Sequence, residues 1–386
     1  MGVQLDSNNL IPSAASSNAG VTGASLNSSL SSSEAARQSC EGVAPAFNQL
    51  YSKFLHLFEK GACCTEVVES LLTFKEWLIK DDQLPPQQRA LALNNLALAL
   101  LNAGNLELAD ELIIHALRLG KNSLSSSELV VLTRNMANVA ALRGDLDFAD
   151  NLLDGVAQRL RSDGRPPFEV GQALSKRARL LMHFERHEKA LEVLQELEAQ
   201  QHESGGPKGV IWAQTQQGVV WGRLGQWERA QRKLSEALNG TLDLAQDFEL
   251  TRAGVLLELS ALILKEGRLN ELRQYSVPVL RLLSHCKEAG LSMHARAQLY
   301  YAFHLLYDGH EGRGLKQAGK AAVLIKEMEQ VGPAAGAALR LELDGLRESY
   351  ELQGKWHAAR IYNKIVGVLV SRSVEGDTQN DTPLVG

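Results

Sequence analysis

A short turn segment that recurs along the chain is the feature that most restricts the possible fold. It begins with glycine, has a large apolar residue two positions later and, in four of its five clear copies, a small residue five positions later. Its clear copies begin at Gly104, Gly144, Gly225, Gly267 and Gly354. Glycine at the end of an apolar helical run ends the helix, because a left-handed residue costs least without a Cβ atom. Each copy therefore predicts the end of one helix and the start of the next.

The spacing of these copies is about 40 residues or about twice that, which is typical of a helical solenoid. Each longer gap should then contain a weaker copy. The segment at Glu185 fills the first gap without its glycine, and the segment at Gly309 fills the second. The pattern predicts an all-α fold, a right-handed solenoid of about seven to eight antiparallel helix pairs.

Apolar residues at helical spacing define the individual pairs. We expect pairs near residues 86–121, 125–161, 168–201, 209–238, 248–286, 292–329 and 333–371, after a degenerate leading pair near 45–79. The chain has 386 residues, which is long for one globular core, but a solenoid grows by adding pairs along one axis. Ser125 and Glu128 have the spacing of a capping box at the start of one helix.

The two ends of the chain differ in composition from the repeats. Residues 1–44 are rich in Ser, Ala, Asn and Gly and are expected to be a disordered leader, because they cannot bury enough apolar area to fold. A leader for type III-like secretion has a similar composition and stays open as an alternative. Residues 45–372 form the expected superhelix, and 373–386 are expected to be a disordered polar tail.

The repeat pattern resembles that of tetratricopeptide repeat (TPR) proteins. The pair at 86–121 carries the pattern of large and small residues most fully, at Leu93, Leu96, Ala97, Gly104, Leu106, Ala109 and Ala116. The fourth pair carries it in part, at Gly218, Gly225, Trp227, Ala230 and Ala237. The period exceeds the usual 34 residues of the family by several residues, which places the chain nearer to long-repeat members such as kinesin light chain-like and bacterial peptide-sensing proteins.

The resemblance implies that the first helix of each pair lines a concave groove in which a peptide binds. The candidate groove residues are Asn94, Leu98, Asn102, Arg134, Asn138, Arg179, His183, Trp212 and Arg223. Asparagine can hydrogen-bond both sides of a peptide unit, and arginine can hold a carboxylate with two bonds. Asparagine can also tie neighbouring repeats together, and arginine is often simply solvated, so both alternatives stay open here.

The family's clamp for an acidic chaperone tail is incomplete in this chain. Arg134 and Asn138 match its first pair, but Lys176 stands where Asn is required, and Trp212 and Gln216 stand where basic residues are required. We therefore do not expect a dedicated cochaperone.

Nothing in the sequence requires a catalytic, cofactor-binding or metal-binding site. His183 and His187 lie four residues apart, but no third ligand is in view, so we expect no metal site. No phosphate-binding loop or catalytic motif is present, and we expect no cofactor and no enzymatic activity. The net charge of −5 argues against nucleic acid as the main partner, and no apolar run is long enough for membrane insertion.

The sequence therefore predicts a scaffold or adaptor that binds a peptide or an amphipathic helix of a partner protein. Apolar residues assigned to the groove suit an amphipathic segment as much as an acidic tail; they are Leu98, Leu101, Val219, Leu257 and Phe303. The alternatives are a peptide-responsive regulatory protein and a secreted effector. Four cysteines without a disulfide pattern and the lack of a secretory signal favour a cytoplasmic location. The weaker last two pairs make self-association possible.

Overall fold

The computed structural model describes residues 84–102, 105–204, 206–242, 244, 248–286, 289–331 and 333–374. These residues form fourteen α-helices and one short 3-10 helix, and no strand is present among them. The expected leader, the leading pair near 45–79 and most of the expected tail lie outside the described residues. The all-α class predicted from the repeats is confirmed.

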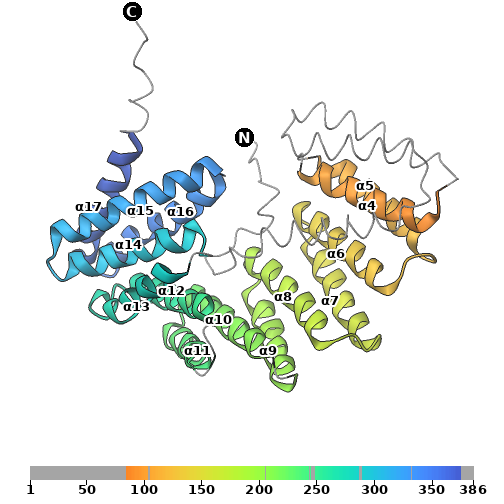
Figure 1. Cartoon of the computed structure of the whole chain (residues 1–386), viewed down its shortest axis with the longest axis horizontal. Helices are drawn as coiled ribbons and strands as arrows, with labels where there is room; N and C mark the ends of the chain where they lie inside the picture. Colours follow the sequence, from red (N-terminus) through yellow and green to blue (C-terminus); the bar gives the residue numbers. More distant parts are fainter. Residues whose placement is uncertain are drawn as a thin grey trace, which may run out of the picture. The chain divides into compact units, whose positions relative to one another are not determined.

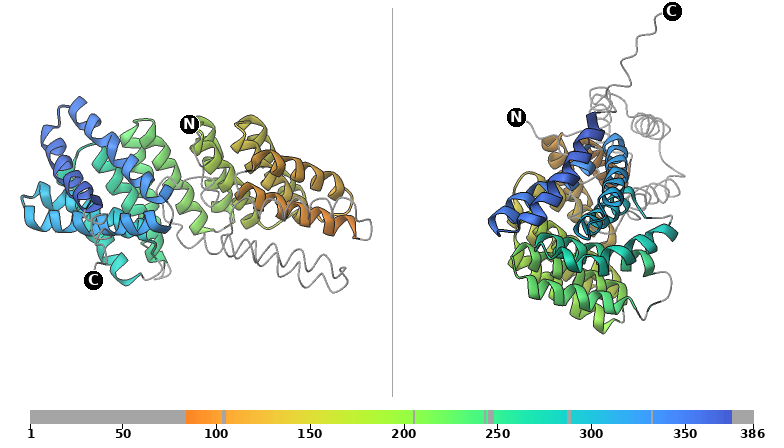
Figure 2. Two further views of the ribbon diagram at one scale, coloured as in Figure 1. Left: turned by 90° about the horizontal axis from the view of Figure 1, so that it is seen from above. Right: turned by 90° about the vertical axis from the view of Figure 1, so that its left-hand side faces the viewer.

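The helices follow one another as seven pairs. Their bounds are α4 Pro86–Asn102, α5 Leu106–Gly120, α6 Ser126–Leu142, α7 Leu146–Ser162, α8 Pro167–His183, α9 His187–Glu203, α10 Pro207–Arg223, α11 Trp227–Gly240, α12 Glu249–Lys265, η3 Leu269–Glu271, α13 Arg273–His285, α14 Leu291–Tyr307, α15 Glu311–Val331, α16 Pro333–Leu352 and α17 Trp356–Val374. Consecutive helices alternate in direction within each pair (Figures 1 and 2). The first helix of each pair has an even number, and the predicted pair limits agree with these bounds to within a few residues.

The chain divides into two compact units, and among the described helices the division falls inside α9, between Val193 and Leu194. Unit 1 contains α4 to α8 and the first part of α9. Unit 2 contains the rest of α9 and α10 to α17. In unit 1, first helix α4 packs against first helix α6; in unit 2, α10, α12, α14 and α16 contact one another in order. Each unit thus has a layer of first helices, which we call its first-helix face.

The repeated turns have one backbone geometry. Glycine occupies the left-handed region in five of the pairs, with φ between 65° and 85° at Gly144, Gly225, Gly267, Gly309 and Gly354. The residue after each of these glycines donates its N–H to a carbonyl five positions earlier, which ends the first helix. In the third pair Glu185 takes the same position at φ 58°. The degenerate copy in the sequence is therefore a real turn, formed without glycine.

Small residues let the two helices of a pair approach closely. The alanine five positions after the turn glycine is fully buried at Ala149 and Ala230. In the fourth pair, a Cβ atom on Gly218 of α10 would lie only 2.6 Å from Leu234 Cγ of α11. In the sixth pair the glycine is on the second helix instead: a Cβ atom on Gly314 of α15 would lie 2.6 Å from Leu306 Cγ of α14. The spacing of small residues in the sequence therefore sets the helix separation.

The capping box predicted at Ser125 is confirmed. The Ser125 side chain accepts a hydrogen bond from the Glu128 N–H, and the Glu128 carboxylate accepts the Ser125 N–H at 2.7 Å. Gln87 of α4 also donates to Glu128 at 3.0 Å, so the cap at the start of α6 is joined to the preceding pair.

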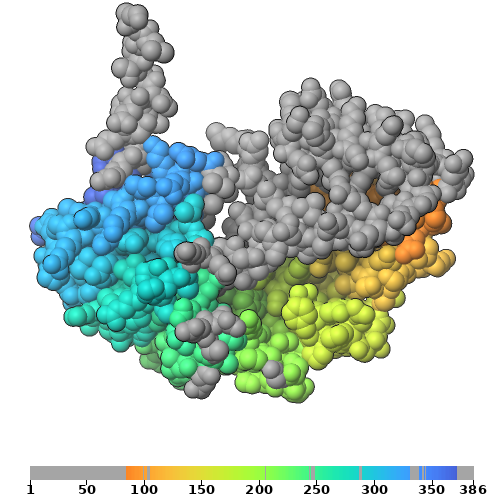
Figure 3. All heavy atoms as spheres, viewed as in Figure 1, coloured from red at the N-terminus to blue at the C-terminus, as the bar shows by residue number. Residues whose placement is uncertain are grey.

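Each unit has its own apolar core, and the largest cluster extends from α12 to α17 in unit 2. The side chains of this part (teal to blue) form one continuous body in Figure 3. Leu101, Leu257 and Phe303 belong to these cores and are at most 4% exposed. Their assignment to the groove was wrong, because the apolar stripe of each first helix is wider than the sequence register indicated.

The seventh pair also contacts the fifth pair, two positions away. The Tyr350 hydroxyl donates to the Leu264 carbonyl, and Lys355 Nζ donates to the Glu266 carbonyl. The Tyr350 and Lys355 side chains cover Gly267, where an added Cβ would meet both. In a regular solenoid each repeat contacts only its neighbours. Unit 2 departs from that rule at this contact.

Candidate functional site

All nine candidate residues lie on first helices, as the sequence predicted. Asn94, Leu98 and Asn102 are on α4, Arg134 and Asn138 on α6, Arg179 and His183 on α8, and Trp212 and Arg223 on α10. The first seven belong to unit 1 and the last two to unit 2. The Asn102 side chain is outside the described part, and we consider the two units separately.

Asn94 has the structural role that the sequence left open for asparagine. Its side chain is 3% exposed, and its Oδ1 accepts a hydrogen bond from Asn135 Nδ2 at 2.9 Å. The two residues are 41 positions apart and join α4 to α6. Because a buried amide without partners is costly, this pair fixes the alignment of the first two repeats. We leave Asn94 out of the proposed ligand site.

Three basic residues of unit 1 form the most unusual electrostatic feature of its first-helix face. Arg134 on α6 and Lys176 and Arg179 on α8 are each half-buried, and we call them the cationic cluster. Burial lowers the pKa of Lys176 to about 7, and the positive charges of Arg134 and Arg179 act on it in the same direction. Burial also lowers the pKa of both arginines. The two helices therefore hold three cationic groups close together in a partly dehydrated place.

No carboxylate in the described part of the chain compensates this cluster at Arg134 or Lys176. Arg134 Nε is buried without a hydrogen-bond partner there, and neither residue takes part in an ion pair. The acids on the neighbouring helix α7 are engaged elsewhere: Asp150 accepts a bond of 2.6 Å from Arg177 Nε, and Asp154 binds the same guanidinium. Partly buried cations are normally paired, so Arg134 and Lys176 have unused capacity for an anion within the described part of the chain.

Two of the remaining candidates lie on the same helices as the cluster, and two lie in the other unit. Asn138 and His183 are half-buried in unit 1, and the His183 ring contacts the Phe184 ring edge-on at 4.7 Å. In unit 2, Trp212 is half-buried and Arg223 is exposed. Of the three candidate arginines, Arg134 and Arg179 belong to unit 1, where both act on Lys176, and Arg223 belongs to unit 2.

Lys176 is the residue whose role the sequence reasoning missed. In the sequence it stands out only as a departure from the chaperone-tail clamp. The signal that could have identified it is the repeat spacing, since Lys176 follows Asn135 by the same interval that separates Asn135 from Asn94. Asn94 and Asn135 occupy this repeat position in the first two pairs and are bonded to each other. Lys176 occupies it in the third pair and has no hydrogen-bond partner in the described part.

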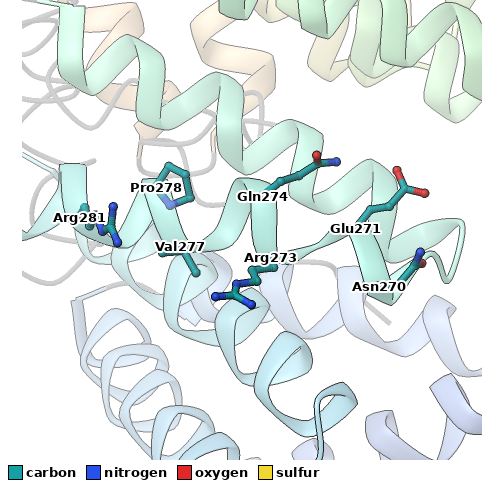
Figure 4. Close-up of a pocket in the computed structure, with 7 residues that line it drawn as sticks. All are labelled: Asn270, Glu271, Arg273, Gln274, Val277, Pro278 and Arg281. Atoms are coloured by element: carbon teal, nitrogen blue, oxygen red, sulfur yellow. The ribbon is translucent and has the colours of Figure 1, made fainter.

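Other kinds of site find little support in the described residues. They contain no group of three or more His, Cys, Asp or Glu side chains that could hold a metal ion. None of the helices described there is both long and apolar enough to cross a lipid bilayer. A surface depression of about 560 Å³ lies along η3 and α13 in unit 2. Its side chains, including Arg273, Gln274 and Arg281, spread along the helix without converging on one point (Figure 4).

Comparison with known proteins identifies the class. No protein-family model matches the sequence, and no curated protein matches it. Among solved structures, apo RapI is similar over 89% of this chain and 92% of its own, with 13% identity and a TM-score of 0.60. Aspartyl phosphate phosphatase F from Bacillus subtilis is similar over 87% of each chain, with 12% identity and a TM-score of 0.56. The apo form of the quorum sensor NprR from B. thuringiensis covers 94% of this chain and 96% of its own, with 13% identity and a TM-score of 0.51.

The chain therefore has the helical-repeat fold of these proteins, in agreement with the TPR-like repeat pattern of its sequence. At this level of identity the similarity defines the fold. The activity has to be argued from the residues of this chain.

Proposed function

We propose that this protein is a non-enzymatic interaction scaffold whose unit 1 binds an extended peptide of a partner protein on its first-helix face. The proposal depends on one observation: the cationic cluster on α6 and α8, of which Arg134 and Lys176 are uncompensated by acids in the described part. Asn138 and His183 on the same two helices supply further hydrogen-bonding groups.

A repeat surface suits this role because successive first helices offer side chains at regular intervals, as an extended peptide does. The alternative of a peptide-responsive regulator uses the same surface and differs only in the response that peptide binding triggers. A cytoplasmic location is part of the proposal, motivated by the absence of a disulfide pattern among four cysteines.

The experiment is a selection of random peptides, displayed on phage, against the full chain. Selected peptides are then titrated against the wild type and an Arg134→Glu/Arg179→Glu variant. We expect the variant to lose at least about tenfold in affinity, because charge reversal in a half-buried place repels the former ligand. Arg223→Glu, made alone, reports whether the ligand also depends on unit 2.

The matched control reverses two exposed charges at the end of second helix α5, Arg118→Glu and Lys121→Glu. This control should bind as the wild type does, and circular dichroism should show equal helix content in all variants. If the selected peptides bind the cluster variant and the wild type equally, the proposed surface is wrong.

A further inference from the structure

The charge balance of the cationic cluster restricts the chemistry of its ligand. Arg134 of α6 and Lys176 and Arg179 of α8 are half-buried, and Arg134 Nε is buried without a hydrogen-bond partner in the described part of the chain. The charges that act on Lys176 are those of Arg134 and Arg179, both positive. On α7, the acids Asp150 and Asp154 are held by Arg177, and Lys189 of α9 lies 3.7 Å from Asp150. In the described part of the chain, these ion pairs keep both acids engaged away from the cluster.

The repeat position of Lys176 shows that its lack of a partner is local to this pair. At the corresponding position in unit 1, Asn94 and Asn135 are bonded to each other. In unit 2, Gln217 donates to Glu198 at 2.7 Å, and Glu258 binds Arg296 at 3.0 Å. The fold thus satisfies polar groups at this position elsewhere and leaves Lys176 without a hydrogen bond in the described part.

We propose that Arg134, Lys176 and Arg179 form a binding site for one oxyanion, a carboxylate or a phosphate, carried by the peptide that the first-helix face of unit 1 binds. This inference rests on the proposed function and adds the chemical class of the anchoring group. Two planar guanidinium groups and one ammonium group match the several oxygens of such an anion. Binding supplies the charge that the cluster lacks and favours the protonated form of Lys176.

Proton uptake follows from this arrangement and gives the site a distinctive pH dependence. The pKa of Lys176 is about 7 in the free protein, so its ammonium form is about half populated at neutral pH. An oxyanion in contact with it raises that pKa. Affinity for a carboxylate should therefore fall about tenfold between pH 6 and pH 8, since the bound state needs a proton that the free state has lost. For a phosphate the fall should be smaller, because phosphoserine gains negative charge above its second pKa of about 6. His183 lies two turns further along α8, so a variant of it serves as a control for this pH dependence.

The test uses the full chain and three labelled peptides of equal length: tetraglutamate with an amidated end, tetraglutamine, and a phosphoserine peptide with glycine neighbours. Affinity is measured by fluorescence anisotropy at pH 6 and pH 8. We expect tetraglutamate or the phosphoserine peptide to bind at least about tenfold more tightly than tetraglutamine at pH 6. The peptide that binds more tightly identifies the source of the oxyanion.

Variants separate the site from general attraction to basic residues. Lys176→Met should lose most of the preference for the anionic peptide, and Lys176→Arg should keep it at pH 8, because arginine does not titrate there. His183→Gln should keep the wild-type pH dependence. Lys121→Met removes an exposed lysine and should change nothing.

Two results would overturn the inference: equal binding of tetraglutamine and both anionic peptides, or an unchanged anion preference in Lys176→Met. In either case the displayed peptides could still lose affinity in Arg134→Glu/Arg179→Glu. The proposed function would then stand without the oxyanion site. If the displayed peptides also bind Arg134→Glu/Arg179→Glu as tightly as the wild type, both the proposed function and the oxyanion site are wrong.

Discussion

At the scale of single residues, Glu185 shows that the fold tolerates a local cost. It is the only residue other than glycine with a positive φ in the described part of the chain. A left-handed conformation costs an L-residue with a Cβ atom about 1–2 kcal/mol. Its side chain is exposed. The turn persists because the packed helices on either side of it require the chain to reverse there.

Replacement of Glu185 by glycine should therefore stabilise the protein. We expect the free energy of unfolding to rise by about 0.5–1 kcal/mol, since relief of the strained φ exceeds the added entropy of glycine in the unfolded chain. Urea denaturation followed by circular dichroism measures the change. Gly144→Ala is the converse control, because φ is 85° there and nothing lies within 4 Å of the added Cβ. A loss of stability in Glu185→Gly would contradict the strain.

Lys176 makes a second prediction at this scale, on stability and pH. Its pKa is lowered from 10.5 to about 7 in the folded protein, so between these values the unfolded chain binds more protons than the folded chain. Stability must then increase with pH across this window. Relative to Lys176→Met, the wild type should become more stable from pH 7 to pH 9.5 in urea denaturation. If the difference in the free energy of unfolding between the wild type and Lys176→Met does not change with pH, the ammonium form of Lys176 is not destabilised in the folded protein.

At the scale of helices, glycine has opposite effects according to what it faces. Gly218 on α10 lies against Leu234 of α11, and an added methyl group would meet Leu234 at 2.6 Å. Gly155 on α7 has open space around its Cβ position and is exposed. The first glycine is needed for the contact between two helices, and the second only weakens its own helix.

We expect Gly218→Ala to destabilise the protein by about 1–3 kcal/mol, because the extra methyl overpacks a closed contact. Gly155→Ala should instead stabilise it by about 0.5–1 kcal/mol, since alanine is the better helix former. Thermal unfolding of both variants beside the wild type measures the difference. Equal effects of the same sign would mean that α10 and α11 can separate without cost.

The helices also show which features the sequence could predict. The turn glycines and the small residue after them have local causes, so the pair limits were predictable to within a few residues. The burial of Leu257 and Phe303 was not, because it depends on how much of each first helix its neighbours cover. The cationic cluster combines both cases. Arg134 and Arg179 follow from helical register, but the role of Lys176 depends on two helices that meet only in the fold.

At the scale of the whole molecule, the seventh pair of unit 2 contacts the fifth pair, which is not its neighbour in the sequence of pairs. Tyr350 and Lys355 donate to carbonyls at the end of α12 and cover Gly267. Removing the Lys355 donor leaves the Glu266 carbonyl without a partner in the described part, at a cost of about 1–3 kcal/mol, whereas the Leu264 carbonyl keeps the N–H of Gly267 at 2.9 Å. The stability of the fifth turn therefore depends on residues more than 80 positions later.

Hydrogen exchange can test this dependence. In a Tyr350→Phe/Lys355→Met variant we expect amides at 262–268 to exchange about tenfold faster, while amides of α15 stay protected. Tyr362→Phe on α17 serves as a control that changes another buried tyrosine of the last pair. Faster exchange across all of unit 2 would instead indicate that the last pair is needed for the whole unit.

The same contact has a consequence for synthesis of the protein. Helices that contact only their sequence neighbours can pack soon after they leave the ribosome, because their partners follow at once. The Glu266 carbonyl accepts its bond from Lys355, 89 residues later. At about 5–20 residues per second, translation takes roughly 4–18 s to pass from Glu266 to Lys355, so the fifth turn obtains this hydrogen bond only after that interval.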